Sequence, residues 1–408
     1  MKEKHTFSNL KKANSLGAPF WDGARDAGVH GQVYLPRSRA RVLLEDGECV
    51  NMSSYSYLGL DEHPDICRAA EEQLRSTGVL NSSLSRVRMT LSVLDEAESA
   101  LSELFDADVG TIGSCASAAW AMLPMLAAGL LTGGTPPLMV FDQHAHFCMN
   151  SMKSVCADET DVMTIRHNDV EALEDLCRRH ELVAYIGDSV YSTYGSVAPL
   201  ADLANLQSRY GLFLFLDDAH GTSVVGRDGR GYALEMLDGI NDRMMIITSL
   251  NKGFGASGGA IMFGPRSDKS VRRLAIGNGG PFMWSQRINT AGLGAIIASA
   301  RLHFGPEIPT RQNALQNNIQ LFDKLYEALG RGNGLPVRYI PMSSEEVAIK
   351  SSEFLLRRGF YVEPDFFPIV KRGGAGLRVR IRSTMSHADI TGLCASLNLL
   401  PELQNVSG

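Results

Sequence analysis

Six short stretches in the middle of the chain are apolar along their whole length, instead of alternating between apolar and polar positions. Strands that are covered on both faces of a sheet have this pattern. Helical patterns lie between them, for example at 170–180 and 200–210. This alternation predicts an α/β fold with a mainly parallel sheet, whose ligands bind at the carboxyl ends of the strands. The predicted strands are 109–112, 138–141, 162–165, 182–186, 212–216 and 244–248.

The pattern changes after about residue 300. A long helical pattern covers 310–329, and short strand candidates follow at 337–340, 360–362 and 377–381. A chain of 408 residues is long enough for two packed domains. We therefore expect three parts: an irregular N-terminal arm (1–55), a large domain (56–299) and a smaller C-terminal α+β domain (300–408).

Composition and charge narrow the class of protein. Apolar residues make up 44% and the net charge is -6, so no basic field predicts binding to nucleic acid or an anionic membrane. The most apolar stretch, 118–131, is too short to span a bilayer and contains Pro124, so it predicts a buried helix. The N-terminus lacks the apolar core of a signal peptide. The seven cysteines form no CxxC pair, which predicts reduced thiols in a cytoplasmic protein.

Two carboxylates and a histidine follow the apolar stretch at 212–216. Asp217 and Asp218 come directly after it, and His220 and Gly221 come next. A buried carboxylate needs a cationic partner, because burying an unpaired charge is costly. A protonated pyridine nitrogen would be such a partner. The alternative is that Asp217 only caps a helix.

Lys252 follows the predicted strand at 244–248 and precedes a glycine-rich segment. An amine held there can form a Schiff base with an aldehyde, and glycines let a ligand approach the backbone closely. Ser249 is a candidate for binding a phosphate. Alone, Lys252 would be read as a surface lysine in a flexible loop. Together with Asp217 and His220, it indicates an enzyme that uses pyridoxal 5'-phosphate (PLP).

These motifs resemble those of the α-oxoamine synthases, a branch of the fold-type I PLP-dependent transferases. Residues 217–226 read DDAHGTSVVG, similar to the family pattern D-[DE]-A-H-[GS]-x-G-x-x-G. The resemblance extends from about residue 57 to residue 389. It implies a large PLP-binding domain with a smaller C-terminal domain, and a homodimer with shared active sites. It also implies the decarboxylative condensation of an α-amino acid with an acyl thioester, which gives an α-amino ketone.

The resemblance implies catalytic roles for four residues. Lys252 would hold PLP covalently, Asp217 would pair with the pyridine nitrogen, and His220 would bond the 3-oxygen of the ring. Residues 142–146 resemble a D-x-x-x-H segment whose last histidine stacks on the cofactor, so His146 is preferred to His144. No Cys or carboxylate stands beside these two histidines at the spacing of a zinc site, and no metal is expected.

Other matching positions imply binding roles. Asp188 and Ser192 match an E-x-x-[FY]-S segment, which places an acidic residue near the substrate and a serine near the cofactor. Ser114 and Cys115 stand where backbone amides at a helix start would bind the phosphate. Residues 378–380 resemble an R-[IL]-R strand whose guanidinium binds the carboxylate of the amino acid. Arg380 is preferred for this role, and Arg378 is the alternative.

Some positions depart from the family pattern. Tyr55 replaces an asparagine near the substrate carboxylate, Thr90 replaces a glycine, and the bulky Trp284 replaces a small residue near the phosphate of the partner subunit. These changes fall at substrate positions and predict a substrate of specialised metabolism. Two other functions stay open: a different PLP reaction, such as transamination or β-elimination, and a catalytically weak homologue that acts as an assembly partner.

The acyl donor is either a coenzyme A thioester, which the resemblance favours, or a thioester of an acyl-carrier protein. A basic cluster in this acidic chain would attract an anionic donor, either the phosphates of coenzyme A or an acidic carrier protein, or is only a solvated helix face. The cluster consists of Arg266, Lys269, Arg272 and Arg273.

Overall fold

The computed structural model describes residues 10–38 and 40–400, which divide into two compact units. The first unit contains Leu60–Tyr191 and Val197–Pro309. The second contains Ser192–Ser196 together with the described residues of 9–59 and 310–408. The described N-terminal residues, which the sequence suggested as a separate arm, thus group with the C-terminal residues.

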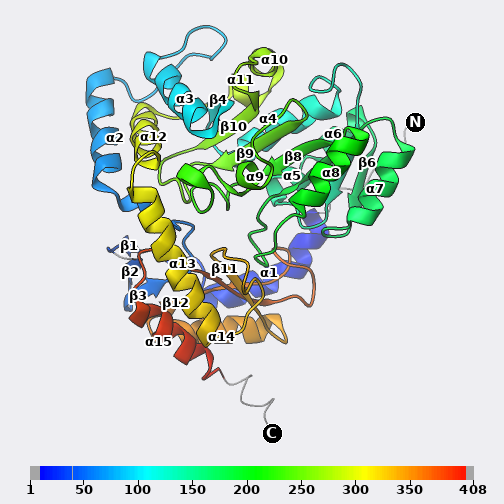
Figure 1. Ribbon diagram of the computed structural model, residues 1–408. Coiled ribbons are helices and arrows are strands. Elements are labelled where there is room, and N and C mark those ends of the chain that lie inside the picture. Colours follow the sequence, from blue (N-terminus) through cyan, green and yellow to red (C-terminus); the bar gives the residue numbers. More distant parts are fainter. Residues whose placement is uncertain (1–9, 39, 401–408) are drawn as a thin grey trace. The chain divides into compact units, whose positions relative to one another are not determined.

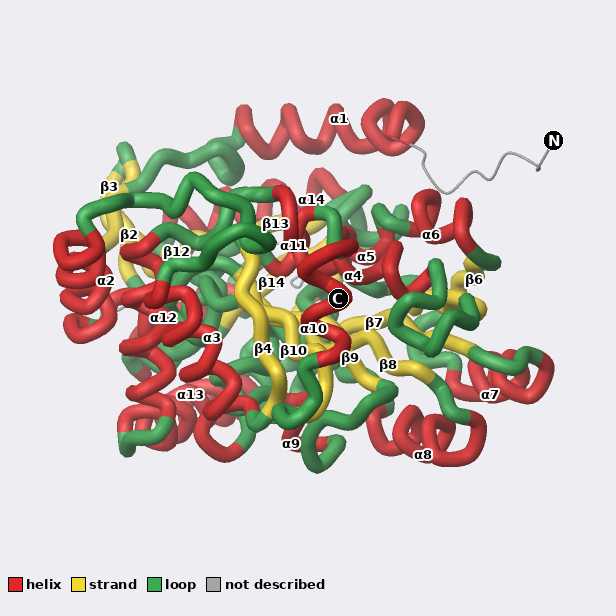
Figure 2. The backbone as a smooth tube through the Cα atoms, turned by 90° about the horizontal axis from the view of Figure 1, so that it is seen from above, coloured by secondary structure: helices red, strands yellow, loops and turns green. Residues whose placement is uncertain are grey.

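A seven-stranded sheet forms the centre of the first unit, in the order β4-β10-β9-β8-β7-β5-β6 (Figures 1 and 2). All neighbouring strands from β9 to β6 run parallel, whereas β10 is antiparallel to both β4 and β9. The predicted mainly parallel α/β fold is therefore confirmed. The strands are β4 (Ala107–Ile112), β5 (Leu138–Asp142), β6 (Val162–Ile165), β7 (Val183–Asp188), β8 (Phe213–Asp217), β9 (Met244–Ser249) and β10 (Gly259–Pro265).

Two strands differ from the sequence prediction. Strand β10 was not predicted, because its sequence begins in the glycine-rich segment after Lys252. Strand β6 was predicted to be buried, but it is the last strand of the sheet and Met163 is 42% exposed. An edge strand pairs with one neighbouring strand only and is more open to solvent than a central strand. An apolar stretch in the sequence therefore does not by itself show that both faces of the strand are buried.

Helices cover both faces of this sheet, as Figure 1 shows. One apolar core joins the sheet to α3, α7, α8 and α12, and the other joins it to α4, α5, α6, α10 and α11. Helix α4 contains residues 118–127 of the buried helix predicted for 118–131, whereas 128–131 form a turn in which Leu130 is 42% exposed. None of the helices in the described part of the chain is long and apolar enough to cross a membrane. The helices are α2 (Pro64–Thr77), α3 (Ser92–Phe105), α4 (Cys115–Ala127), α5 (Phe147–Asn150), α6 (Lys153–Glu159), α7 (Val170–Arg179), α8 (Leu200–Tyr210), α9 (Tyr232–Met236), α10 (Ser270–Asn278), α11 (Pro281–Trp284) and α12 (Thr290–His303).

The second unit contains two smaller sheets and four helices in its described residues. One sheet has the order β1-β2-β3-β12 and the other β11-β14-β13. Its strands are β1 (Leu35–Pro36), β2 (Arg41–Leu44), β3 (Gly47–Asn51), β11 (Val337–Pro341), β12 (Phe360–Tyr361), β13 (Glu363–Asp365) and β14 (Gly376–Arg380). Its helices are α1 (Leu10–Asp26), α13 (Glu307–Leu325), α14 (Glu345–Arg357) and α15 (His387–Leu397).

The N-terminal segment was predicted to be irregular, and this prediction was wrong for its described part. Residues 10–26 form helix α1, even though Gly17 and Pro19 lie inside it. Tertiary packing explains the difference, because Ala24 lies in a small core with Ile349 and Phe366. A Cβ atom on Gly17 would lie 2.9 Å from the carbonyl oxygen of Phe367, so the glycine permits this close approach.

A buried carboxylate on α3 links several parts of the first unit. Glu98 Oε1 accepts hydrogen bonds from Arg86 Nη1 at 2.8 Å and from the backbone N–H of Thr111 at 2.8 Å. Its other oxygen pairs with Arg272. Arg272 and Lys269 also pair with the buried Asp108. Half of the predicted basic cluster is therefore neutralised by buried carboxylates, which weakens its interpretation as a donor-binding surface.

Replacing Glu98 with alanine is expected to lower the free energy of unfolding by about 3–5 kcal/mol, because Arg86 would stay buried without its partner. Unfolding in urea and on heating measures the free energy of unfolding of the wild type and of each variant. The matched control is Glu103→Ala, an exposed position on the same helix, where a change within about 0.5 kcal/mol is expected. Equal losses of stability in both variants would contradict the structural role of Glu98.

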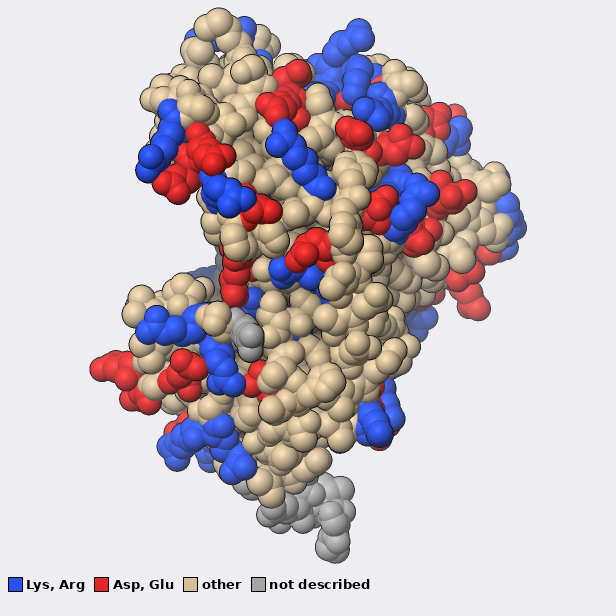
Figure 3. All heavy atoms as spheres, turned by 60° about the vertical axis from the view of Figure 1, so that its left-hand side comes forward, with Lys and Arg blue, Asp and Glu red and all other residues tan. Residues whose placement is uncertain are grey.

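Charged side chains elsewhere are mixed in sign. On the face drawn in Figure 3, acidic and basic side chains are interspersed and no large surface of one sign stands out. This arrangement agrees with the net charge of -6. It offers no extended basic surface on that face for a polyanion.

Candidate active site

Two carboxylates lie side by side at the carboxyl ends of neighbouring parallel strands. Asp188 ends β7 and Asp217 ends β8, and the two residues are paired in the sheet register. Both are buried. Asp217 Oδ1 accepts the backbone N–H of Ala219 at 2.9 Å, which fixes the orientation of the carboxylate. Burial, followed by the charge of Asp217, raises the pKa of Asp188 well above its ordinary value.

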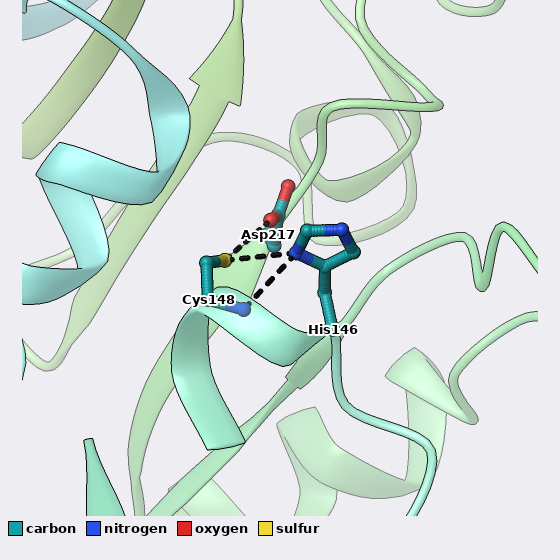
Figure 4. Close-up of side chains that lie close together, drawn as sticks. All are labelled: His146, Cys148 and Asp217. Atoms are coloured by element: carbon teal, nitrogen blue, oxygen red, sulfur yellow. Dashed lines mark hydrogen bonds between the residues drawn. The ribbon is translucent and has the colours of Figure 1, made fainter. Parts of the chain in front are cut away.

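Two thiols face the other oxygen of Asp217. Cys115 Sγ lies 3.5 Å from Asp217 Oδ2. Cys148 Sγ lies 3.9 Å from the same atom, and Figure 4 shows this second contact. Burial and then the charge of Asp217 raise the pKa of both thiols, which keeps them protonated. A thiol is a weak donor, so Oδ2 retains the capacity to accept a stronger hydrogen bond from a ligand.

His146 lies beside this group. Its backbone N–H donates to Asp188 Oδ2 at 2.8 Å, and its Nδ1 lies 3.0 Å from Cys148 Sγ (Figure 4). His144 instead stacks on His167, with 4.3 Å between the ring centroids. The geometry therefore favours the choice of His146 as the histidine of this site.

Lys252 and His220 form a contact of their own. Lys252 Nζ lies 2.8 Å from His220 Nε2. The turn that carries Lys252 requires Gly255, which has φ 71° and whose added Cβ would lie 2.4 Å from Leu60 Cβ. The charge of Lys252 acts on Asp188 and on both thiols, so the lysine belongs to the same site.

Helix α4 begins at the end of β4 and offers backbone N–H groups there. Ser114 caps the helix, because its Oγ accepts the backbone N–H of Ser117 at 3.1 Å. A Cβ atom on Gly259 would lie 2.5 Å from the backbone nitrogen of Cys115, so only glycine lets β10 pass this close. Free N–H groups at a helix start bind anions such as phosphate. Ser249, at the end of β9, donates from its Oγ to Asn251 Oδ1.

These groups fit the chemical needs of PLP. Lys252 would supply an amine for its aldehyde, Asp217 would supply a carboxylate for its pyridine nitrogen, and the start of α4 would supply donors for its phosphate. Among the described residues, the donors to Asp217 Oδ2 are the two weak thiols, so an N–H donor of a ligand would be well accommodated.

Three atoms of this site are also close enough to share a metal ion. His146, Cys148 and Asp217 each offer one ligand atom, and these atoms lie within 4.8 Å of one another. The sequence led to no expectation of a metal, and it gave no role to Cys148. The only signal for Cys148 was its position two residues after His146.

The predicted substrate-binding residues Arg378, Arg380 and Tyr55 lie in the second unit, where the two arginines pair with carboxylates and Tyr55 contacts Arg380. Arg380 Nη2 lies 2.8 Å from Glu363 Oε2 and 2.8 Å from Tyr55 Oη, and its guanidinium lies 4.1 Å above the Tyr55 ring. Arg378 Nη2 lies 2.9 Å from Asp365 Oδ1. Its Nη1 donates to the carbonyl of Ser192, at 3.3 Å. No role was predicted for the two acidic partners, Glu363 and Asp365, which are the first and last residues of a strand of only three residues.

Comparisons with known proteins identify relatives along most of the chain. Residues 47–397 match the family model described as aminotransferase class I and II. The chain is 30% identical over 348 residues to 8-amino-7-oxononanoate synthase of Mycobacterium sp. (strain KMS), covering 84% of this chain and 87% of the relative. It is 27% identical over 383 residues to the mitochondrial 2-amino-3-ketobutyrate coenzyme A ligase of Homo sapiens, covering 90% and 87%.

A solved structure has the same fold. Serine palmitoyltransferase from S. paucimobilis superposes with a TM-score of 0.84 at 19% identity, over 98% of this chain and 100% of that one. The predicted fold class, cofactor and family are thereby confirmed. The chain belongs to the aminotransferase class I and II family and, within it, to the α-oxoamine synthases, which are PLP-dependent acyltransferases.

Proposed function

We propose that the protein condenses an α-amino acid with an acyl thioester, with loss of CO2, to give an α-amino ketone. The observation that carries this proposal is the contact of 2.8 Å between Lys252 Nζ and His220 Nε2, in a site that also contains Asp217. The named relatives are an 8-amino-7-oxononanoate synthase and a 2-amino-3-ketobutyrate coenzyme A ligase, and both names contain an amino ketone.

Bound PLP would delocalise the negative charge that develops at the α-carbon of the amino acid. Asp217 would favour this by holding a positive charge on the pyridine nitrogen. The amine of Lys252 would take the α-proton and later return it, acting as base and then as acid. His220 would position Lys252 Nζ through the contact between them.

The remaining residues would bind and orient. His146 would stack on the cofactor ring, and its backbone is held by Asp188. Backbone N–H groups near Ser114 and Cys115, with the hydroxyl of Ser249, would hold the phosphate. From the resemblance we also propose that Ser192 contacts the cofactor and that Arg380, or alternatively Arg378, binds the carboxylate of the amino acid.

The proposed reaction has a defined stoichiometry, which provides the test. The α-carbon forms a bond with the acyl carbon, the thiol leaves, and the carboxylate departs as CO2. We expect one free thiol and one CO2 for each amino ketone, measured with a thiol reagent and a carboxyl-labelled amino acid. Turnover of the amino acid without thiol release would contradict the proposal and favour transamination or β-elimination.

We favour coenzyme A as the carrier of the acyl group, because one relative bears it in its name. An acyl-carrier protein is the alternative. Thiol release from acyl-coenzyme A, in the absence of any carrier protein, is expected. Release only from the carrier-bound thioester would contradict this choice.

We also propose that two copies of the chain form a homodimer. Apolar side chains near the segment 282–285 are exposed: Val87 at 49%, Met89 at 64% and Trp284 at 71%. Ser85, in the same loop as two of them, donates to the carbonyl of Met283 at 3.1 Å, so the two segments adjoin. An exposed apolar patch of this kind marks an interface. Sedimentation should show a dimer that Trp284→Glu weakens, and a fully active monomer would contradict the proposal.

A further inference from the structure

Four charged side chains of the second unit form ion pairs with one another. Glu363 and Asp365 lie on β13, and Arg378 and Arg380 lie on the antiparallel strand β14. Glu363 Oε2 lies 2.8 Å from Arg380 Nη2 and 3.4 Å from Arg378 Nη2, and Asp365 Oδ1 lies 2.9 Å from Arg378 Nη2. Two guanidinium groups thus face two carboxylates.

The group is electrically balanced near neutral pH. Burial opposes the charge of Glu363, but Arg380 and Arg378 hold its pKa below the ordinary value. Burial raises the pKa of Asp365 to about 6, so it is also largely ionised at pH 7.5. His30 also acts on Glu363, and burial lowers the pKa of His30, which keeps it neutral. Burial and then the charge of Glu363 raise the pKa of Tyr361, which stays uncharged.

This balance constrains the substrate. A carboxylate that binds Arg380, as proposed above, adds a negative charge to a buried group whose positive charges are already matched. Glu363 would then share Arg380 with the substrate carboxylate and would keep only the longer contact of 3.4 Å to Arg378, so this largely buried group would hold one negative charge in excess, which is unfavourable. A neutral side chain brings no positive charge of its own to offset this cost, whereas the α-amino group is used in the reaction with the cofactor.

We infer that the amino-acid substrate carries a cationic side chain, an ammonium or a guanidinium, and that Glu363 recognises it. Glu363 adjoins Arg380, so a substrate carboxylate on Arg380 and a cationic side chain on Glu363 are neighbours. The side chain of Glu363 is 25% exposed, which leaves its carboxylate accessible to a ligand, whereas Asp365 is completely buried. This inference rests on the proposed function and deepens it.

Matched pairs of amino acids test the inference on the PLP-loaded enzyme. L-Arginine and L-citrulline have similar shapes, but only arginine is charged, and L-lysine and L-norleucine form a second pair. Each is titrated while the absorbance of the cofactor is followed, without any thioester. We expect the charged member of a pair to bind at least about tenfold more tightly, the size of a hydrogen bond between charged groups.

Glu363→Gln should bring the ratio within a pair close to one. The control is Glu327→Gln, which changes a side chain that is 89% exposed and should keep the wild-type ratio. Equal binding of charged and neutral members by the wild-type enzyme would overturn the inference even if the variant does not fold. A ratio that persists in Glu363→Gln would overturn the role of Glu363.

A second reaction mixture separates this inference from the proposed function. Thiol release from acyl-coenzyme A is measured with each amino acid of the two pairs. Release with neutral and charged members at similar amino-acid KM values would overturn the inference and leave the proposed function standing. Absence of release with every amino acid, together with no change in cofactor absorbance, would overturn both.

Discussion

Lys252→Ala is expected to abolish covalent attachment of PLP and to reduce turnover by about 10³-fold or more. The loss combines two effects, because the variant lacks both the amine that binds the aldehyde and the proposed acid–base group. His220 would keep its place but lose the partner that lies 2.8 Å from its Nε2. Borohydride reduction followed by peptide mapping should label Lys252 in the wild type and no lysine in the variant.

Lys153 provides a matched control for this experiment. Burial lowers the pKa of Lys153 to about 8, so a larger fraction of this amine is uncharged near neutral pH than in an ordinary lysine. Lys153→Ala is expected to keep covalent PLP and most of the activity. A borohydride label on Lys153 in the wild type would contradict the assignment of Lys252. Circular dichroism should show that both variants keep the fold.

Local patterns predicted six of the seven strands of the large sheet and the residues that follow them. Asp217 ends β8 and Lys252 lies three residues after the end of β9, as the apolar stretches and the polar residues after them indicated. Such features depend on neighbours in the sequence, because a buried strand must be apolar and the site must follow its end. Helix α4 was foreseeable for the same reason.

Contacts between distant segments were not predictable in this way. The thiol of Cys148 reaches Asp217 across 69 residues, and Glu98 pairs with Arg272 across 174 residues. Nothing in the local pattern of Arg378 and Arg380 indicated that both already have acidic partners. These pairings depend on strand order and register, which the order of apolar stretches does not determine.

Pairing with distant residues also changes the interpretation of the basic cluster as a donor-binding surface. Lys269 and Arg272 looked like surface charges because their partners, Glu98 and Asp108, are far away in the sequence. Once they are paired, an experiment that reverses the charge of Arg272 would disturb the fold before it tested a donor. The exposed Arg273 is a better position for such a test.

Asp217→Asn is expected to keep the fold and bind PLP, yet to lower the rate of α-proton removal by about 10²–10³-fold, the cost of removing one preorganised electrostatic partner. The amide oxygen can still accept the backbone N–H of Ala219, as Oδ1 does at 2.9 Å in the wild type. A neutral amide cannot hold a positive charge on the pyridine nitrogen as a carboxylate does, so the cofactor becomes a weaker acceptor of negative charge.

Exchange of the α-proton in deuterated water, followed by nuclear magnetic resonance, isolates this step from thiol release. Asp228→Asn is the matched control, since Asp228 is partly exposed, pairs with Arg227 and is not part of the site. It should exchange at the wild-type rate. If Asp217→Asn also exchanged at that rate while PLP remained bound, the carboxylate would not be the partner of the pyridine nitrogen. The thiols of Cys115 and Cys148, which face Asp217 Oδ2, would then be the groups left beside Oδ2 to contact the cofactor.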